Sequence, residues 1–296
     1  MRERSGAALG LAAYLMWGAF PLYFRLLERS GPFEIVAHRA LWSLVFCGAA
    51  LTVLGRWGQV RAVTPRVVGA LAAGGVLVAA NWTLYVWGVN TGRTLDAALG
   101  YYVNPLLTAL LGVVLLGERL RRAQWVAFAL GGAAAAVLVL GYGEVPVVAF
   151  GVATTFALYG LVKKQAGRTV PALPGLAIET AAIAPLALAL LAWLEWRGAD
   201  TVELLSPYGL LMATSGVVTA VPLLLFAGAT ARIPLVVVGM IQYLTPTLQF
   251  LLGWLAFHEP MPPERWAGFA LVWLAVLVFA VDGVRHHRWP TRLTRP

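Results

Sequence analysis

The sequence predicts an all-α integral membrane protein in which ten transmembrane helices form two inverted five-helix repeats around a central cavity. Of its 296 residues, 60% are hydrophobic and 12% are charged, and the mean hydropathy is +0.79. Soluble domains carry roughly 25% charged residues, so this composition cannot cover a surface that faces water. The 12 tryptophans also fit a membrane protein, because tryptophan favours the headgroup level of a bilayer.

An internal repeat is the second observation behind this prediction. The stretch from Ala97 to Trp125 recurs 141 positions later, without a gap, in the stretch that ends at Trp266. The matching residues include Tyr102 with Tyr243, Asn104 with Thr245, Pro105 with Pro246, Gly112 with Gly253 and Glu118 with Glu259. A duplicated unit about half as long as the chain predicts a repeated architecture. Because each unit holds an odd number of spans, we expect the second unit to be inverted across the membrane.

Ten apolar runs are long enough, or nearly long enough, to cross about 30 Å of hydrocarbon. They lie near residues 6–27, 34–54, 67–90, 96–117, 123–140, 145–163, 173–194, 207–228, 234–257 and 264–282. The first repeat is expected over residues 1–142 and the second over 143–283, followed by a basic cytoplasmic tail over 284–296. The first run follows two arginines, but it is too long for a usual signal core and is interpreted as a retained helix.

The net charge of +9 is explained by topology and requires no nucleic acid. With the N-terminus in the cytoplasm, most Lys and Arg residues fall in cytoplasmic segments, as the positive-inside rule demands. Both termini are therefore expected in the cytoplasm, and the basic tail is expected to lie on anionic lipid. The glycine pairs Gly6 with Gly10 and Gly88 with Gly92 permit close helix contact and leave a homodimer open.

Six runs together carry a resemblance to a known family. They are Glu34–Ser43, Asn81–Trp87, Leu99–Leu106, Ala157–Gly160, Glu179–Thr180 and Gln242–Thr247. In combination they resemble the RarD group of EamA-type transporters, within the drug/metabolite transporter superfamily. The resemblance covers nearly the whole chain and implies ten helices around a central cavity, permease activity and the inner (plasma) membrane of a bacterium. Asp96 is followed by two alanines, where the family pattern leads us to expect small hydroxyl residues.

Arg39, inside the second predicted span, is the sharpest functional signal. Arginine at the bilayer centre costs about 2.5–3.5 kcal/mol on insertion scales, and intramembrane ionisable groups usually mark pathways. Glu34 and His38 are four residues apart and share a helix face. One interpretation is an arginine that binds an anion or carboxylate, beside the titratable His38. The alternative is that Arg39 reaches the outer headgroups with Glu34 as its partner.

Other polar and aromatic residues are candidates for the lining of a substrate cavity. They are Trp42, Asn81, Tyr85, Tyr101, Tyr102, Asn104, Tyr159, Gln242 and Tyr243. Such side chains offer hydrogen bonds and stacking surfaces to a small molecule. For Asn81 and Tyr85 the alternative is hydrogen bonding between helices, which is common in membrane bundles.

Two prolines at equivalent places in the repeats, Pro105 and Pro246, are predicted to kink their helices. Proline removes one backbone hydrogen bond and clashes with the preceding turn. We expect the kinks to act as hinges around the substrate. Asn104 and Thr245, one residue before each proline, have a second interpretation as support for the carbonyl that each kink frees.

Three acidic residues have separate interpretations. Glu179 lies inside the seventh predicted span and is a candidate for substrate binding or a cytoplasmic-side gate, with an ion pair to Lys163 or Lys164 as the alternative. Glu118 and Glu259 follow the ends of the fourth and ninth spans. An acid there opposes the helix dipole, so we expect each to bind an arginine or the N–H groups that start the next helix.

The sequence indicates a permease rather than an enzyme. It contains no Gly-rich phosphate loop, no Cys or His cluster for a metal and no motif that implies a cofactor. We expect a secondary transporter that moves a small organic metabolite or drug outward by alternating access. The alternatives are an intramembrane enzyme that acts on a lipid-like substrate and a membrane sensor that transports nothing. The expected partners are the small-molecule substrate and the lipid bilayer.

Overall fold

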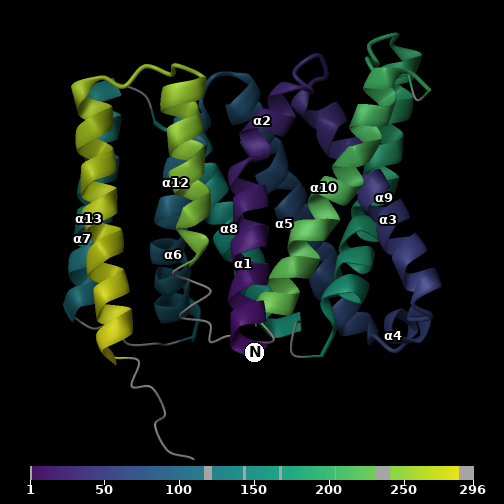
Figure 1. The fold of residues 1–296 in the computed structure, drawn as a ribbon, viewed down its shortest axis with the longest axis horizontal. Helices are drawn as coiled ribbons and strands as arrows, with labels where there is room; N and C mark the ends of the chain where they lie inside the picture. The colour runs from purple at the N-terminus through teal and green to yellow at the C-terminus, as the bar shows by residue number, and fades with distance from the viewer. Residues whose placement is uncertain are drawn as a thin grey trace, which may run out of the picture.

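A computed structural model describes residues 2–116, 122–142, 145–166, 169–203, 205–230 and 241–286. The predicted roles of Glu118 and of the basic tail beyond His286 lie outside these residues. The regular secondary structure of the described part is entirely helical. The helices run side by side, and α1 begins at the end of the bundle where α13 ends (Figure 1). Below, this end, which also carries α4, is the lower end, and the end that carries α2 is the upper end.

Each of the longer helices overlaps one of the predicted apolar runs, and the first residues of the ninth run lie outside the described part of the chain. Their bounds are α1 Arg2–Gly18, α2 Phe20–Arg25, α3 Pro32–Val53, α4 Trp57–Arg61, α5 Pro65–Asn90, α6 Thr94–Leu116, α7 Arg122–Tyr142, α8 Val147–Ala166, α9 Ala172–Trp196, α10 Pro207–Thr230, α12 Leu244–Leu251 and α13 Pro263–His286. A π-helical segment, Leu252–Ala256, extends α12. The short helix α4, which lies outside the predicted spans, was not expected.

Proline and glycine set many of the boundaries. The helices α3, α5, α10 and α13 each begin with proline, whose missing N–H is not needed in the first turn. Glycines with positive φ follow the ends of α3, α5 and α9, where the left-handed conformation closes the helix. They are Gly55 at 63°, Gly92 at 72° and Gly198 at 60°.

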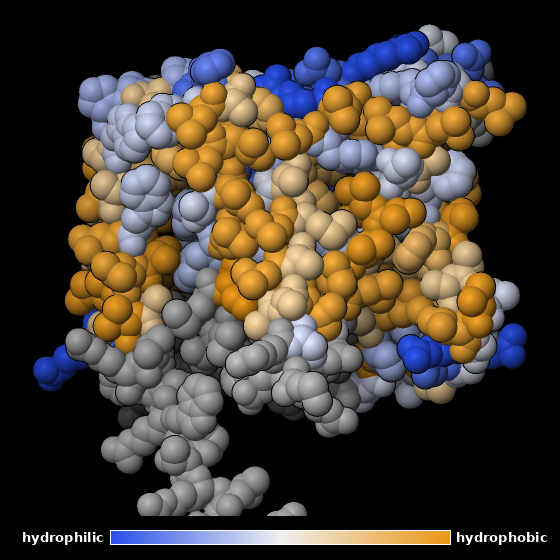
Figure 2. All heavy atoms as spheres, in the orientation of Figure 1, coloured by the Kyte–Doolittle hydropathy of each residue, from blue (hydrophilic) through white to orange (hydrophobic). Residues whose placement is uncertain are grey.

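Among the described residues, six helices are long and apolar enough to cross a membrane. They cover Ser5–Arg25, Pro32–Val53, Pro65–Asn90, Ala172–Trp196, Pro207–Phe226 and Pro263–Asp282. Figure 2 shows apolar side chains spread over the middle of the molecule, whereas strongly hydrophilic residues gather along the upper edge and at the lower corners. Many large apolar side chains are exposed, including Leu186 and Leu188 on α9. The all-α membrane class predicted from composition is thus confirmed.

Helices from the first half of the chain pack mainly against helices from the second half. The most extensive contacts pair α7 with α13, α3 with α9 and α10, α5 with α8 and α9, α6 with α8 and α12, and α1 with α10. Each of these pairs joins a helix that ends by Tyr142 to one that begins after it. The two halves therefore share one core rather than forming separate bundles.

Two glycines, 141 positions apart, lie at equivalent helix contacts. Gly75 of α5 packs on the backbone of Glu179 in α9, where an added Cβ would lie 2.6 Å from the carbonyl oxygen. Gly216 of α10 packs on the backbone of Trp42 in α3, where an added Cβ would clash with the carbonyl group. The absence of a side chain lets both helix pairs approach closely.

Proline marks two of the helix breaks. α1 and α2 are separated at Ala19, two residues before Pro21. Tyr243 lies outside helical structure, and Pro246 falls in the first turn of α12 just after it. Proline is tolerated in a first turn, so the break satisfies its geometry. The equivalent Pro105 lies inside α6, which runs unbroken from Thr94 to Leu116.

Candidate functional site

Arg39 is buried inside the bundle, nearer to its upper end. It lies seven residues after Pro32, or about 10 Å along α3 from the upper end, and only 3% of its surface is exposed. Its Nε donates a hydrogen bond of 2.6 Å to the hydroxyl of Thr219 in α10. The guanidinium lies 4.0 Å from the ring centre of Trp82 and 5.2 Å from that of Phe24. Thr219 and these aromatic rings therefore fix the position of the charge.

No carboxylate in the described part of the chain forms an ion pair with Arg39. Glu34, its expected alternative partner, instead accepts hydrogen bonds from the backbone N–H of Thr201 at 2.8 Å and from its hydroxyl at 2.9 Å. The Nη1 atom of Arg39 and the hydroxyl of Tyr85 are both buried without a hydrogen-bond partner. The cluster around Phe24 therefore contains a positive charge and a hydroxyl that each have an unpartnered polar atom.

A row of aromatic rings extends from this cluster through the bundle. Ring centres lie 5.9 Å apart from Phe24 to Tyr85, 5.8 Å from Tyr85 to Tyr101, 5.8 Å from Tyr101 to Phe156 and 5.9 Å from Phe156 to Tyr159. The rings come from α2, α5, α6 and α8, hence from both halves of the chain. Tyr85, Tyr101 and Tyr159, three of the predicted site residues, thus lie in one continuous row.

Glu179 lies at the far end of this row. Its side chain is buried in α9, seven residues above Ala172 at the lower end, and its Oε2 accepts a hydrogen bond of 3.1 Å from Tyr159. The aromatic row therefore connects an arginine near one end to a carboxylate near the other. The alternative partners, Lys163 and Lys164, have side chains outside the described part of the chain.

Asn81 joins three helices. Its Nδ2 donates to the carbonyl of Val152 at 2.9 Å and to the hydroxyl of Thr155 at 3.0 Å, both in α8. Its Oδ1 accepts a hydrogen bond of 3.3 Å from Tyr101 in α6. This geometry is that of the interhelical alternative, and it positions Tyr101 within the aromatic row.

Asn104 and Thr245 make equivalent contacts in the two halves. Asn104 of α6 donates to the carbonyl of Ala153 in α8 at 3.1 Å, and Thr245 of α12 donates to the carbonyl of Tyr14 in α1 at 2.9 Å. Both bonds leave their own helix. The expectation that these residues satisfy a carbonyl freed next to the proline is therefore corrected, because they tie neighbouring helices together instead.

A second polar cluster surrounds Tyr102 and Tyr243. Their rings stack with centres 6.4 Å apart, and the hydroxyl of Tyr102 lies 2.7 Å from that of Thr247. Gln249 donates from Nε2 to the carbonyl of Trp17 at 3.2 Å, while its Oε1 is buried without a partner. This second cluster joins α1, α6 and α12.

Three other predicted residues lie near these clusters without joining them. His38 is buried in α3, next to Arg39 in the chain, whereas Trp42 and Gln242 are half-buried. Within the described part of the chain, none of the three side chains forms a hydrogen bond. Their predicted contact with substrate stays a prediction.

Sequence reasoning missed Thr219, Phe24 and Gln249. Thr219 is one hydroxyl in an apolar run, and Phe24 is one of many aromatics, so neither stands out without its neighbour Arg39. The spacing of Gln249 could have identified it as a candidate, because it lies seven residues after Gln242 and a continuous helix would place both on one face.

The upper end of the bundle is held by a carboxylate that binds a helix start. Glu259 accepts hydrogen bonds from the backbone N–H groups of Thr94 at 2.7 Å and Leu95 at 2.9 Å. A carboxylate is favourable there because the first N–H groups of a helix lack partners. An ion pair of 3.1 Å between Arg265 and Asp96 lies beside it. The predicted structural role fits this geometry, although the helix bound is α6 rather than the next helix.

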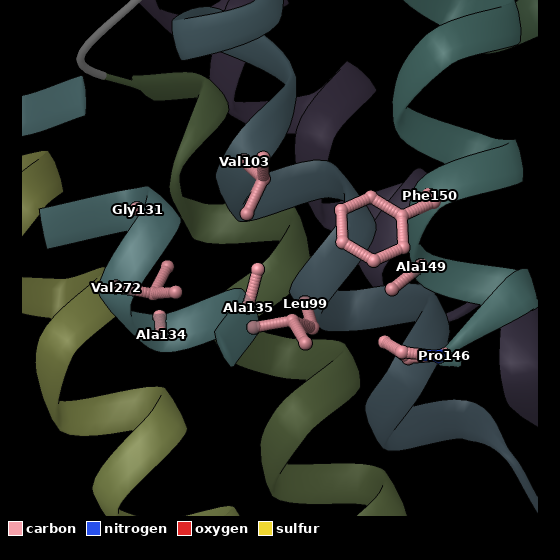
Figure 3. Close-up of a pocket in the computed structure, with 9 residues that line it drawn as sticks. All are labelled: Leu99, Val103, Gly131, Ala134, Ala135, Pro146, Ala149, Phe150 and Val272. Carbon is pink, nitrogen blue, oxygen red and sulfur yellow. The ribbon is translucent and has the colours of Figure 1, made fainter. Parts of the chain in front are cut away.

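A small apolar cavity lies within the apolar packing that also contains Tyr102. It is lined by residues of α6, α7, α8 and α13 and by Pro146, all labelled in Figure 3. Its volume of about 30 Å³ holds on the order of two water molecules, and carbon atoms form nearly all of its wall. Among the described residues, no group of His, Cys, Asp and Glu could hold a metal ion.

Comparison with known proteins shows relatives that match over nearly the whole chain. Protein RarD of Streptomyces exfoliatus is 46% identical over 289 residues, which cover 97% of this chain and 91% of that protein. An uncharacterized transporter of Pseudomonas aeruginosa is 44% identical, with coverage of 99% and 98%. Protein RarD of Escherichia coli is 37% identical, with coverage of 97% for each. A solved crystal structure with 21% identity shares the fold, with a TM-score of 0.62 over 97% of this chain and 100% of the other.

The family match occurs twice along the chain. The model of the EamA-like transporter family matches residues 4–140 and again residues 145–281. Together the two matches leave out little more than the ends and a short connection. The chain therefore belongs to the EamA-like transporter family, as a RarD-type permease of the membrane.

Proposed function

We propose that this permease is a secondary transporter that moves a small organic metabolite or drug outward by alternating access. The observation that carries the proposal is the buried cluster around Arg39. A charge without an ionic partner, a free hydroxyl and a row of aromatic rings meet where both halves of the chain pack together. Intramembrane ionisable groups of this kind mark substrate pathways.

The proposed architecture has ten spans in two inverted repeats, over residues 1–142 and 143–283. The two family matches support this division. Equivalent contacts support the inversion, because Gly75 and Gly216 each pack on a helix of the opposite half. Asn104 and Thr245 also bind carbonyls of the opposite half. Inverted repeats allow two halves to exchange conformations and so expose one site to either side in turn.

The depth of the site fits alternating access. Thr219 lies twelve residues after Pro207, or about 18 Å along α10 from the upper end. Arg39, its bonded partner, lies about 10 Å along α3, so the site extends from the upper part toward the middle of a hydrocarbon layer about 30 Å thick. Above the site, Glu34 joins α3 to Thr201, and Glu259 joins the segment after α12 to α6. Opening toward the upper side requires both contacts to separate.

In the proposed topology the upper end faces outward and the lower end faces the cytoplasm. The start of α1 and the end of α13 lie together at the lower end (Figure 1). The basic residues expected in cytoplasmic segments, such as Arg56 and Arg61 around α4, also lie there. In a bacterium the membrane of such a permease is the inner membrane.

A reversible cross-link at the upper end tests alternating access. Ser30 and Thr201 come from opposite halves, and their hydroxyls form a hydrogen bond. In a Cys47→Ala background, Ser30→Cys with Thr201→Cys places two thiols within reach of a disulfide. We expect oxidation to stop the flux of a transported solute in reconstituted vesicles and reduction to restore it.

The two single-cysteine variants are the controls, and their flux should not respond to oxidant. Flux that continues in the fully cross-linked protein would contradict alternating access through this end. A screen of metabolites and drugs for stabilisation of the purified protein supplies the solute for the assay.

A further inference from the structure

We propose that the solute carried by this permease is a small organic carboxylate with an apolar body, bound between Nη1 of Arg39 and the hydroxyl of Tyr85. This inference rests on the proposed transport function and names the chemical class of its substrate. It follows from the charge of the cluster, from the number of its free donors and from the composition of its walls.

The charge of Arg39 requires a negative partner. A buried charge is stabilised only when it is paired and hydrogen-bonded, and the described part of the chain supplies no carboxylate to this guanidinium. The hydroxyl of Thr219, which accepts from Nε, is neutral and does not compensate the charge. A water molecule would satisfy the unpartnered N–H groups but leave the charge uncompensated. An anionic solute would satisfy the N–H groups and also compensate the charge.

The free donors match the two oxygens of a carboxylate. Nε of Arg39 is already bound to Thr219, which leaves Nη1 buried and unpartnered. The second unpartnered donor is the hydroxyl of Tyr85, whose surface is only 2% exposed. Phe24 contacts both residues, since its ring centre lies 5.9 Å from that of Tyr85 and 5.2 Å from the guanidinium, so Arg39 and Tyr85 belong to one cluster.

The walls of the site match a carbon body. The guanidinium lies over the rings of Trp82, Phe24 and Phe20. Asn81, the nearest amide in the row, has its groups bound to α8 and Tyr101 and offers little to a polar solute. Aromatic walls bind apolar and planar groups well, whereas they give a highly hydroxylated solute few partners.

Matched pairs of probes test this class directly. The purified full-length protein is titrated calorimetrically with benzoate, phenylacetate and hexanoate, and with the neutral amide of each acid. At least one carboxylate is expected to bind about tenfold or more tightly than its own amide, because a hydrogen bond to a charged group is the stronger kind. If no carboxylate binds better than its amide, the proposal is overturned.

Three variants locate the interaction. In Arg39→Gln the preference for the carboxylate over its amide should disappear. In Tyr85→Phe binding of the carboxylate should weaken several-fold while the preference remains. Arg197→Gln is the matched control, because Arg197 also lies over a tryptophan ring, that of Trp193, but at an exposed position. A preference that survives in Arg39→Gln would also overturn the proposal, and Tyr85→Phe keeps the test valid if Arg39→Gln fails to fold.

Flux through reconstituted vesicles separates this proposal from the proposed function. If the amides cross and the carboxylates do not, the protein is a transporter and the carboxylate assignment is wrong. If a carboxylate binds with the stated preference but no probe crosses, the binding site stands and the transport function is wrong.

Discussion

At the scale of single residues, the bond between Arg39 and Thr219 determines where the buried charge lies. The guanidinium is long and flexible, and its aromatic neighbours attract it without fixing its rotation. The 2.6 Å hydrogen bond from Nε to the Thr219 hydroxyl fixes one edge of the planar guanidinium group. Nη1 is then free to meet a solute. The hydroxyl thus positions the arginine through a contact that spans α3 and α10.

Replacing this hydroxyl gives the first prediction. Thr219→Val keeps the shape of the side chain but leaves Nε buried without an acceptor, which should cost about 1–3 kcal/mol of stability. Thr219→Ser keeps the acceptor and should resemble the wild type. Thermal unfolding of the detergent-purified variants measures the difference. Equal stability of the valine and serine variants would show that the bond contributes nothing.

The sequence identifies the arginine but not its environment. Arg39 stands out because a charge in an apolar run is costly. Thr219, 180 positions away, becomes meaningful only when α3 and α10 pack together. Glu34, only five residues away, is the partner of Arg39 in one interpretation of the sequence, yet it binds Thr201. Proximity in sequence therefore misled where long-range packing decides the partner.

At the scale of helices, close approach depends on small residues. Gly75 and Gly216 lie where one helix backbone meets another, so that even a methyl group would meet a carbonyl. Interfaces in membranes favour such residues, since packing replaces the hydrophobic driving force between helices. The two contacts hold α5 against α9 and α10 against α3. The helices that carry Arg39, Thr219 and Glu179 are thereby held together.

Alanine at these glycines gives the second prediction. Gly75→Ala and Gly216→Ala should each lower the stability by about 1–3 kcal/mol, because the added methyl group overpacks a backbone contact. Gly69→Ala in α5 and Gly48→Ala in α3 are matched controls, since nothing lies within 4 Å of a Cβ at either position. Thermal unfolding compares the four variants. If Gly75→Ala and Gly216→Ala are as stable as the two control variants, the close packing of these helices is contradicted.

Hydropathy was a good guide to helices and a poor guide to their interruptions. The boundaries of α3, α5 and α9 follow from proline and glycine, whose backbone preferences are local. The break at Tyr243 is consistent with the kink expected near Pro246, but α6 continues through Pro105. The same residue type thus lies inside an unbroken helix in one repeat and next to a helix break in the other.

At the scale of the whole molecule, the two halves form one packed body. Its apolar surface lies between two polar ends (Figure 2). Composition predicted this membrane class, and the internal repeat predicted which segments would be equivalent. The contacts between halves could not be derived from the sequence, because hydropathy is nearly uniform around each span and marks no contact face.

The orientation of this body gives the third prediction. Arg29 is exposed at the upper end, and Gln59 is exposed in α4 at the lower end. Two variants, Arg29→Cys and Gln59→Cys, are made separately in a Cys47→Ala background. A membrane-impermeant maleimide should label the cysteine at position 29 in intact cells and the one at position 59 only after the membrane is opened. The reverse pattern would place the termini outside.

Alternating access is tested most directly by a distance across the upper end. Arg29 and Asp200 are exposed neighbours of Ser30 and Thr201, from opposite halves, and accept spin labels without disturbing the core. In lipid nanodiscs the proposed mechanism predicts two distance populations, one short and one longer, whose ratio shifts when a transported solute is added. One short distance that stays unchanged with and without solute would contradict the mechanism.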